Sequence, residues 1–316
     1  MTVNHNGAVL NFAEKYQAAI AKGFSDQQLR TQILWNSPSN NEINFDGAKH
    51  VKVPKLTIDG GRKDRTRNTI TNAVGNYSND YYTYELTFDR YWETLVDPLD
   101  VDETNMVTSI ANVTNAFNVQ QKLPEMDRYM MSQLYKETAK KNADGVHNDE
   151  LTEANILPQF DAAMARMDEN RVPSTGRILF VTPKTNTILK SAEAQNRQAV
   201  INGNGDIARN VYSLDSVNIV VIPSDLFQSD YDFTEGAKVI DDSLQMNMML
   251  IWNGAQIAPQ KYSFVGMDAP SAATSGNFHY YEQEYADVIV LDPKAAGIEI
   301  FVDKAASKKT KTTSSK

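Results

Sequence analysis

The sequence predicts an α+β fold in which a projecting β-hairpin and a long helix precede a layered α/β region. Two β-favouring segments, HVKVPKLTI (50–58) and YYTYELTF (81–88), flank a long stretch rich in Gly, Asn, Thr and charge. Apolar residues then recur at helical spacing from Met106 to Leu134. After Gly145, short apolar strands alternate with amphipathic helices, as they do in a layered α/β domain.

Composition narrows the class of protein. The chain has 316 residues, 41% of them hydrophobic, which fits one large globular domain or two modest ones. No run reaches the roughly 18 apolar residues that span a bilayer, and the N-terminus lacks the layout of a signal peptide, so we expect no membrane association. Without cysteine the chain has no disulfide, no thiolate nucleophile and no Cys-based zinc site, and a reducing cytoplasm is the simplest setting.

The net charge bears on any contact with nucleic acid. A formal charge of −9 argues against a protein that grips DNA over its whole surface, since phosphate binding needs a basic surface. An acidic wall could still enclose DNA without gripping it, because repulsion would keep the polymer mobile. The charge therefore fits a container better than a nucleic-acid clamp.

The first 48 residues predict an arm. Apolar residues recur at helical spacing over 8–22, and Gly23 would end that helix. The next stretch, WNSPSNNEINFDG (35–47), is rich in Asn, Ser and Pro. This composition predicts an extended, weakly structured segment.

Residues 49–90 predict a long hairpin. Pro54 favours an edge strand, because proline cannot donate a hydrogen bond to a ladder. A compact domain seldom keeps a connection as long as 59–80 unless it is functional or disordered. Two interpretations stay open: a solvated surface hairpin, or a projecting arm that a neighbouring subunit stabilises, since an isolated hairpin is marginal in water.

A basic patch lies in that connection and supplies our candidates for contact between subunits. Its members are Arg62, Lys63, Arg65 and Arg67. The patch either keeps the hairpin soluble or forms ion pairs with an adjacent subunit. Binding of nucleic acid is less favoured, because no aromatic residue is interleaved within the patch.

The longest predicted helix runs from about Glu103 to Asn142. Thr104 or Asp102 can cap its start. Pro124 interrupts the pattern and predicts a bend or a restart. One apolar face should bury against neighbouring strands, since so long a helix gains little from propensity alone. The core candidates on this face are Ile110, Val113, Phe117, Met126, Met130 and Leu134.

The rest of the chain predicts a mixed α/β region followed by a tail. The expected elements are a helix in 151–170, a strand at 177–183, a helix at 184–193, a strand at 216–227, a strand at 245–259 leading into a short helical turn, and two or three strands in 277–302. The polar, basic residues 304–316 cannot bury a core and predict a disordered tail.

No pattern marks a catalytic, cofactor-binding or metal site. The densest acidic set is Asp97, Asp100, Asp102 and Glu103. As a calcium loop it fails, because Asn105 stands where glycine is required and Ala111 where the bidentate glutamate belongs. The run 202–206 lacks the third glycine of a dinucleotide fingerprint and the Lys-Ser/Thr of a phosphate loop. We therefore predict no enzyme, cofactor or metal, although abundant carboxylates leave an α/β enzyme open as an alternative.

Five stretches together resemble the major capsid proteins of tailed bacteriophages, which have the Hong Kong 97 fold. The resemblance covers most of the chain, from about Phe12 to Val302, and its specificity lies in the order and spacing of the stretches. In that order they are the extended arm, the hairpin 50–89, LDVDETN running through LPEMDRYMMSQLY, RVPSTGRILFVTP, and MMLIWNGAQIAPQKY with YADVIVLDPKAAGIEI.

The resemblance implies a division of the chain. Its parts are an N-terminal arm (1–48), an extended loop (49–90), a peripheral domain with a spine helix (91–150), an axial domain (151–260), strands that return to the peripheral domain (261–303) and the tail (304–316). Because the arm begins almost at Met1, we expect this protein to lack the large N-terminal scaffolding segment of some relatives. A covalent Lys–Asn cross-link, known in the founding phage, cannot be placed on this sequence.

The resemblance also implies a function. The chain would self-assemble as hexamers and pentamers into an icosahedral shell that encloses double-stranded phage DNA without sequence-specific binding. A separate scaffolding protein and a portal are expected partners, and a decoration protein is a further candidate. The expected location is the virion capsid, and the host cytoplasm during assembly.

Two alternatives remain beside the phage capsid. A cellular encapsulin-type nanocompartment shares the fold but holds enzymes instead of DNA. The Asn/Thr-rich loop and the basic tail favour the phage over this alternative. An α/β enzyme with an unrecognised carboxylate site is the second alternative.

Overall fold

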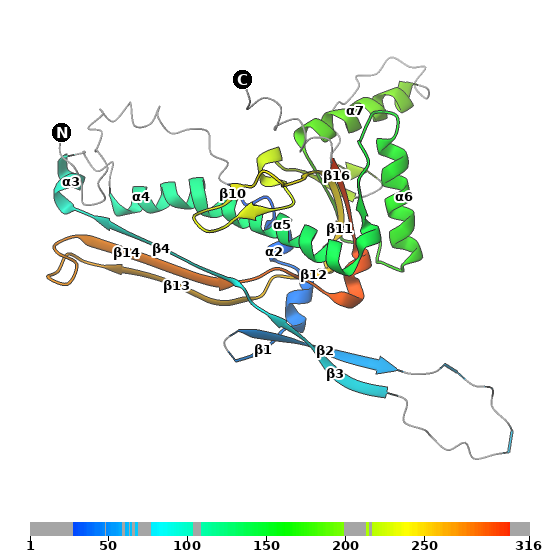
Figure 1. The fold of residues 1–316 in the computed structure, drawn as a ribbon, viewed down its shortest axis with the longest axis horizontal. Helices are drawn as coiled ribbons and strands as arrows, with labels where there is room; N and C mark the ends of the chain where they lie inside the picture. Colours follow the sequence, from blue (N-terminus) through cyan, green and yellow to red (C-terminus); the bar gives the residue numbers. More distant parts are fainter. Residues whose placement is uncertain are drawn as a thin grey trace.

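The structure is a computed structural model that describes residues 28–47, 49–58, 61–62, 64, 67–68, 77–103, 109–198, 213–214 and 217–303. The described chain is elongated (Figure 1). One end holds a sheet covered by helices, and a long helix runs from there over three strands to the other end. A hairpin projects away from both.

The largest sheet has six strands in the order β5-β16-β11-β6-β8-β7. They are β5 (Val146–His147), β6 (Arg177–Val181), β7 (Ser213–Leu214), β8 (Val217–Val221), β11 (Gln245–Trp252) and β16 (Ile298–Asp303). Strands β6 and β8 run parallel, whereas β11 is antiparallel to both of its neighbours. Strand β6 is buried along its whole length, as expected of a strand covered on both faces.

Different helices cover the two faces of this sheet. Helix α6 (Ile156–Glu169) packs on the face that carries Leu179, and helix α5 (Leu123–Lys141) packs on the face that carries Ile178. Adjacent strand residues point to opposite faces, so both helices find an apolar surface. Helix α7 (Pro183–Gln198) joins α6 in a smaller cluster. The mixed α/β region that the sequence predicts is therefore present.

Two strands of this sheet come from segments that we assigned elsewhere. We expected 261–303 to return as a whole to the peripheral domain, but β16 pairs with β11 in the six-stranded sheet. We placed 91–150 in the peripheral domain, but β5 pairs with β16. The assignment was wrong for these strands because the sequence of a short apolar strand does not show which sheet it joins.

The second sheet has three strands in the order β13-β14-β4. They are β4 (Phe88–Val96), β13 (Gln260–Asp268) and β14 (Phe278–Ala286). The helical turn that we predicted after the 245–259 strand was wrong, because the chain makes the short strand β12 there and then enters β13. The shorter elements are β9 (Tyr231–Asp232), β10 (Lys238–Val239), β12 (Gln256–Ile257), β15 (Ile289–Val290) and the 3₁₀ turns η3 (Ala143–Gly145), η4 (Ser224–Leu226) and η5 (Asp292–Gly297).

The long helix begins later than the sequence predicts. We expected it to start within the acidic stretch, capped by Thr104 or Asp102. Asp102 instead lies in a separate helix, α3 (Pro98–Glu103), and Thr104 lies outside the described residues. The long helix starts with α4 (Ile110–Phe117), whose N-cap position is Ser109. Pro98 is the first residue of α3, a position at which proline favours the start of a helix.

Pro124 distorts the long helix without ending it. Residues Asn118–Lys122 form a π-helical turn between α4 and α5, and the N–H of Leu123 donates to the carbonyl of Asn118. A proline ring clashes with the carbonyl four residues before it, and a wider turn directly before Pro124 accommodates that clash. Backbone angles stay helical through the turn, so α4 and α5 form one rod rather than a restarted helix (Figure 1).

The apolar face of the long helix divides into two halves. Met130 and Leu134 are fully buried in the cluster shared with the six-stranded sheet. The half-buried candidates are Ile110, Val113, Phe117 and Met126. Phe117 stacks flat on Trp92 of β4, with ring centroids 3.8 Å apart. The expectation of one fully buried face was therefore wrong for the first half, which lies on a single three-stranded sheet.

The hairpin is an uninterrupted ladder. Strands β2 (His50–Ile58) and β3 (Tyr77–Glu85) pair residue by residue along their full lengths. The predicted second strand, 81–88, was misplaced, because the chain leaves the ladder after Glu85 and Phe88 already belongs to β4. Strand β1 (Asn44–Asp46) pairs only with residues 50–52 of β2. Pro54 therefore lies where β2 has a partner on one side only.

The segment 28–47 is not the weakly structured arm that we predicted. It forms helix α2 (Gln32–Trp35), the 3₁₀ turn η1 (Pro38–Glu42) and β1. The Ser37 hydroxyl lies 2.8 Å from the Asn253 carbonyl and 2.7 Å from the Gln256 carbonyl. The polar residues that suggested a loose arm thus bond the backbone of the body. The predicted helix 8–22, the run 202–206 and the tail 304–316 lie outside the described residues.

The two halves of the helix predict unequal stability losses. Leu134→Ala leaves a cavity in an enclosed core and should lower the free energy of unfolding by about 2–5 kcal/mol. Phe117→Ala removes a half-buried ring and should cost clearly less, although the ring is larger. Urea unfolding followed by circular dichroism measures both losses. An equal or larger loss for Phe117→Ala would show that the first half of the helix is enclosed after all.

Candidate assembly surface

One face of the hairpin is free. Val51 and Val53 are buried against the body, together with Ile257 and Leu291. Because side chains alternate along a strand, the next residues on the opposite face point away from the body. These are Leu56, Ile58, Tyr77 and Tyr81, which we call the hairpin face, and Leu56 and Tyr77 are 66% and 72% exposed. An exposed apolar surface of this kind makes the hairpin face a candidate for contact with another protein chain.

The basic patch continues the hairpin beyond this face. Arg62 and Arg67 are exposed, whereas Lys63 and Arg65 lie outside the described residues. On β2 itself, Lys52 lies over the ring of Tyr81, 5.9 Å from the ring centroid. Lys52 is paired with Asp46 of β1 at 2.5 Å, so the cations beside the hairpin face are those of the basic patch at its far end.

The three-stranded sheet also has a free face, which the sequence analysis missed. Trp92 packs on the long helix, so its neighbour Tyr91 points to the opposite face and is 68% exposed. Tyr281 lies between Tyr91 and Phe264, with ring centroids 6.2 and 6.3 Å away. Tyr262 continues the row along β13 and lies stacked beside Phe264. We call these four aromatic residues the aromatic sheet face.

Acidic residues border the aromatic sheet face. Asp89, Glu93 and Asp268 are exposed on the same side of the sheet. His279 lies between two of them, 3.7 Å from Glu93 and 3.8 Å from Asp268. This acidic border contrasts with the cations beside the far end of the hairpin face.

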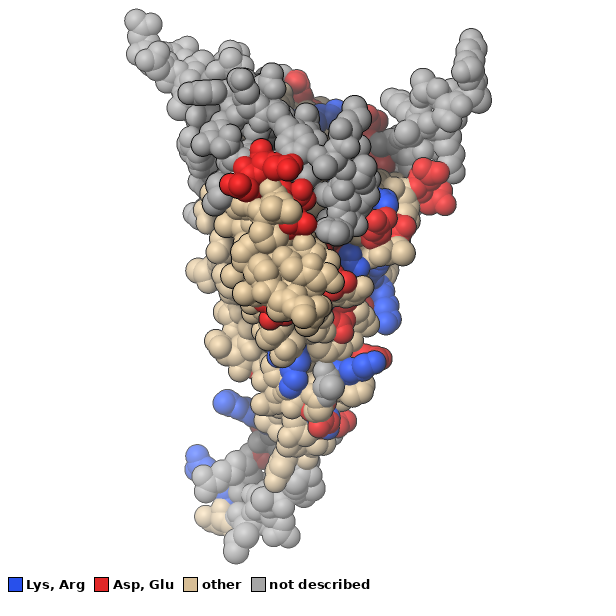
Figure 2. Space-filling model, turned by 90° about the vertical axis from the view of Figure 1, so that its left-hand side faces the viewer, with Lys and Arg blue, Asp and Glu red and all other residues tan. Residues whose placement is uncertain are grey.

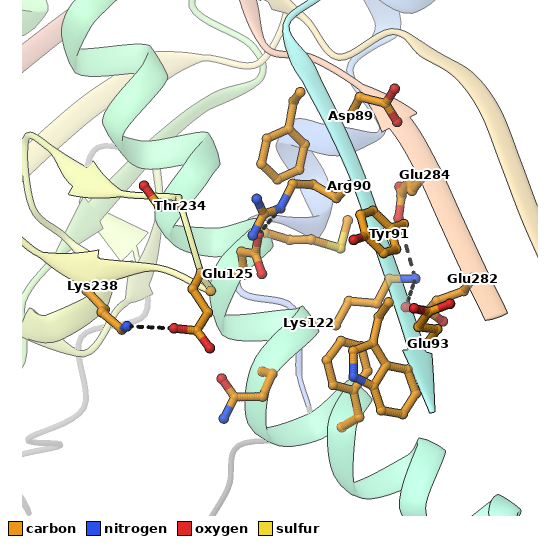
Figure 3. Close-up of a pocket in the computed structure, with 17 residues that line it drawn as sticks. Asp89, Arg90, Tyr91, Glu93, Lys122, Glu125, Thr234, Lys238, Glu282 and Glu284 are labelled. Atoms are coloured by element: carbon orange, nitrogen blue, oxygen red, sulfur yellow. Dashed lines mark hydrogen bonds and ion pairs between the residues drawn. The ribbon is translucent and has the colours of Figure 1, made fainter. Parts of the chain in front are cut away.

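The helix side of the same sheet holds a charged groove of roughly 750 Å³ (Figure 3). It lies between β4, β14, the long helix and the turn that joins β9 to β10. Arg90 Nε lies 2.7 Å from Glu125 Oε1, and Arg90 Nη1 donates to the Phe233 carbonyl at 2.7 Å. Lys122 lies 3.4 Å from both Glu282 and Glu284.

The charged side chains in the groove form ion pairs that join different elements of the same chain. Burial raises the pKa of Glu125, and the adjacent Arg90 opposes that rise. Arg90 thus ties β4 to the helix, and Lys122 ties the π-helical turn to β14. The groove is therefore a charged seam that fastens the helix to the sheet, and it presents no cluster of free groups for a ligand.

A buried carboxylate lies at the root of the hairpin. Asp287 is 4% exposed and accepts hydrogen bonds from the backbone N–H of Thr87 at 2.7 Å and from the Tyr129 hydroxyl at 2.7 Å. A second buried carboxylate, Asp127 of α5, accepts from the backbone N–H of Thr31 at 2.9 Å and from its hydroxyl at 2.7 Å. Helix α5 thus reaches both the hairpin root and the arm through buried polar contacts.

The distal end of the long helix and sheet is acidic. Helix α3 and the residue before it carry Asp97, Asp100, Asp102 and Glu103. Figure 2, which looks at this end, shows a group of acidic side chains near the viewer and basic side chains lower down, toward the hairpin. Charge is therefore distributed unevenly along this side of the molecule.

The described part of the chain offers little for other chemistry. No group of three or more His, Asp or Glu residues in it is arranged to hold a metal ion. Among the described helices, none combines the length and the apolar character needed to cross a membrane. The free surfaces are instead apolar and charged faces suited to protein contact.

These features define a known fold, the Hong Kong 97-like fold of phage capsid proteins. The mature capsid of bacteriophage PhiM1 superposes with a TM-score of 0.60 at 13% identity, over 82% of this chain and 83% of that one. A structure from Mycobacterium phage Bobi gives 0.57 at 10% identity, over 92% and 95%. The capsid of cyanophage A-1(L) gives 0.55 at 11% identity, over 93% and 97%.

The likeness is one of structure and not of sequence. No protein-family model and no curated protein matches the sequence. At identities this low, the similarity establishes the fold, and the expectation of a Hong Kong 97-like α+β fold is confirmed.

The buried carboxylates of Asp127 and Asp287 should make the folding stability of the chain depend on pH. Burial raises the pKa of Asp127 and of Asp287, although hydrogen bonds from the chain oppose the rise. A folded-state pKa above the unfolded value means that the folded chain binds the proton more tightly. The contribution of each group to the free energy of unfolding is therefore largest in acid and falls as pH rises through the folded pKa.

Asp287→Asn and Asp127→Asn test this sign, because asparagine does not titrate. The stability of wild type minus that of either variant should decrease as pH rises from about 4, the ordinary pKa of aspartate, towards neutrality. Urea unfolding at a series of pH values measures the difference. Parallel curves for wild type and variants would mean that neither carboxyl has a raised pKa.

Proposed function

We propose that this chain is the shell-forming subunit of a phage-type capsid. Copies would assemble as hexamers and pentamers into an icosahedral shell that encloses double-stranded DNA. The proposal rests on one observation: the chain has the fold of capsid proteins, and its projecting hairpin exposes an apolar face. A structural role is proposed because the solved structures that share the fold are capsid proteins.

The hairpin face and the aromatic sheet face complement each other. Both expose large apolar side chains, such as Ile58 on the hairpin and Tyr91 on the sheet. Inside one chain the hairpin projects away from the sheet (Figure 1). We infer that the hairpin face of one copy lies on the aromatic sheet face of a second copy, which buries both.

Charge favours the same pairing. Arg62 and Arg67 lie beyond the hairpin face, whereas Glu93 and Asp268 border the aromatic sheet face. Opposite charges around an apolar contact fix orientation and speed encounter more than they add affinity. The basic patch is thus proposed to orient the hairpin on its neighbour.

The remaining expectations follow from the capsid proposal. The arm, extended loop, peripheral domain and axial domain would keep their family roles, with β5 and β16 counted in the axial sheet. A separate scaffolding protein and a portal are proposed partners, and a decoration protein a further one. The subunit would act in the virion capsid and assemble in the host cytoplasm.

Negative-stain microscopy of purified protein, alone and with its scaffold, tests the proposal. Closed shells large enough for a phage genome support it. Small shells loaded with protein would instead indicate an encapsulin-type compartment. Discrete small oligomers under all conditions would contradict a shell and favour the enzyme alternative.

The hairpin should depend on a neighbour for order. In the unassembled chain, amides of 53–58 and 77–82 should exchange quickly, since a two-stranded ribbon is marginal in water. After assembly they should become protected, whereas the buried strand β11 should be protected in both states. Hydrogen exchange with mass spectrometry measures this. Equal protection of the hairpin before and after assembly would contradict the proposed contact.

The basic patch should control assembly and not folding. Replacing Arg62, Lys63, Arg65 and Arg67 together by Gln should slow shell formation and leave the melting temperature unchanged. Exposed ion pairs contribute only about 0–1 kcal/mol each, so the joint variant is the informative one. Light scattering at low salt measures the rate of assembly. Wild-type assembly should itself slow as salt is added, because physiological ionic strength screens the attraction between exposed charges more than about 8 Å apart.

A control variant shows whether assembly depends on where the cations lie or only on the net charge of the chain. It removes the same number of exposed cations away from the hairpin, at Lys136, Lys140, Lys184 and Lys238. We expect this variant to assemble like wild type. Equal slowing of both variants would show that net charge matters and the patch does not.

A further inference from the structure

The chain passes from one sheet to another within two residues. Strand β3 ends at Glu85 in the sheet β1-β2-β3, and β4 begins at Phe88 in the sheet β13-β14-β4. Only Leu86 and Thr87 join them. The direction in which β3 leaves the body depends on this connection, while on the other side of the hairpin β1 follows the η1 turn, which bonds the body.

Apolar contacts hold the Leu86–Thr87 connection against the body but do not fix the direction of the hairpin. Leu86 is buried in a cluster with Val51, Ile257 and Leu291. Burial of apolar surface has no directional preference, so such a cluster keeps the root against the body while leaving its angle free. Fixing the angle requires directional contacts, and hydrogen bonds supply them.

The directional contacts converge on one carboxylate. Asp287 Oδ2 accepts from the backbone N–H of Thr87 at 2.7 Å and from its hydroxyl at 3.1 Å. Asp287 Oδ1 accepts from the Tyr129 hydroxyl at 2.7 Å. The Asp287 backbone N–H donates to the Pro259 carbonyl at 3.0 Å, which fixes the residue itself.

Tyr129 anchors this set in the core. It belongs to α5, is 3% exposed, and stacks on Phe88, the first residue of β4, with ring centroids 3.7 Å apart. A second hydroxyl supports the same connection, because Tyr285 donates to the Leu86 carbonyl at 2.9 Å. Both residues of the connection, Leu86 and Thr87, are thus hydrogen-bonded to rigid parts of the body.

We propose that Asp287 is a positioning residue that clamps the hairpin in one direction relative to the three-stranded sheet. With the clamp intact, the hairpin extends at a single angle; without it, the hairpin pivots about Leu86 and Thr87 on its apolar root. The clamp is a property of a single chain. Its consequence, that hairpin direction sets how one copy meets the next, rests on the proposed function.

The absence of cysteine makes the clamp directly measurable. Cysteines replace two exposed serines, Ser78 on the hairpin and Ser263 on β13, and carry spin labels in the unassembled chain. Pulsed electron paramagnetic resonance then gives the distribution of distances between the labels. Because the chain is unassembled, failure of the clamp and failure of the shell proposal are separate outcomes.

Asp287→Asn is the test and Asp127→Asn is its matched control. Asparagine keeps the size of Asp287 but turns one acceptor into a donor. In either orientation that donor faces a backbone N–H, that of Thr87 or that of Val288, neither of which can accept. We expect the width of the distance distribution to grow about twofold, since hydrogen bonds to a buried charged group supply the main restraint. Asp127→Asn also removes a buried carboxylate but acts on Thr31. Because the bonds of Ser37 to the body lie between Thr31 and the hairpin, the distribution should match wild type.

Two results would overturn the proposal. One is an unchanged distribution in Asp287→Asn, and the other is equal broadening in Asp127→Asn, which would indicate general loosening. If Asp287→Asn does not fold, Tyr129→Phe replaces it, because that change removes only one hydroxyl from the clamp. A broadened distribution in Tyr129→Phe supports the proposal, and an unchanged one overturns it.

Discussion

The burial of helix α5 is the constraint on which the other parts of this structure depend. Leu134 and its neighbours fill the apolar face shared with the six-stranded sheet, which fixes the helix in place. The same helix presents Asp127 to the arm and Tyr129 to Asp287 at the hairpin root. Since buried polar groups need partners, the arm and the hairpin root take positions that the core dictates.

The sequence reveals the elements whose signals are local. Helical periodicity locates the long helix and its C-terminal core residues, Met130 and Leu134. Alternation locates the hairpin, and short apolar runs locate most strands of the six-stranded sheet. It does not reveal which sheet β16 joins, because that depends on partners far along the chain. It also misreads the Ser- and Asn-rich arm, since Ser37 bonds carbonyls that no sequence window contains.

Some of the candidate surfaces could also be predicted from the sequence, and others could not. The basic patch is visible as a run of cations, and the structure places Arg62 and Arg67 at the exposed end of the hairpin. The aromatic sheet face was missed because it forms only when β4, β13 and β14 align. Asp287 did leave a signal: a lone charge in the apolar run ADVIV predicts a buried, hydrogen-bonded group. That signal could have been found.

Native-state hydrogen exchange in the Leu134→Ala background tests the central role of α5 most directly. The amides of Thr31 and Thr87 both donate to buried carboxylates, and both depend on this helix. If α5 unites the arm and the hairpin root, the opening free energies of both amides fall together, by the same amount as global stability. If either amide opens at its wild-type free energy, that part folds independently of α5 and the account is wrong.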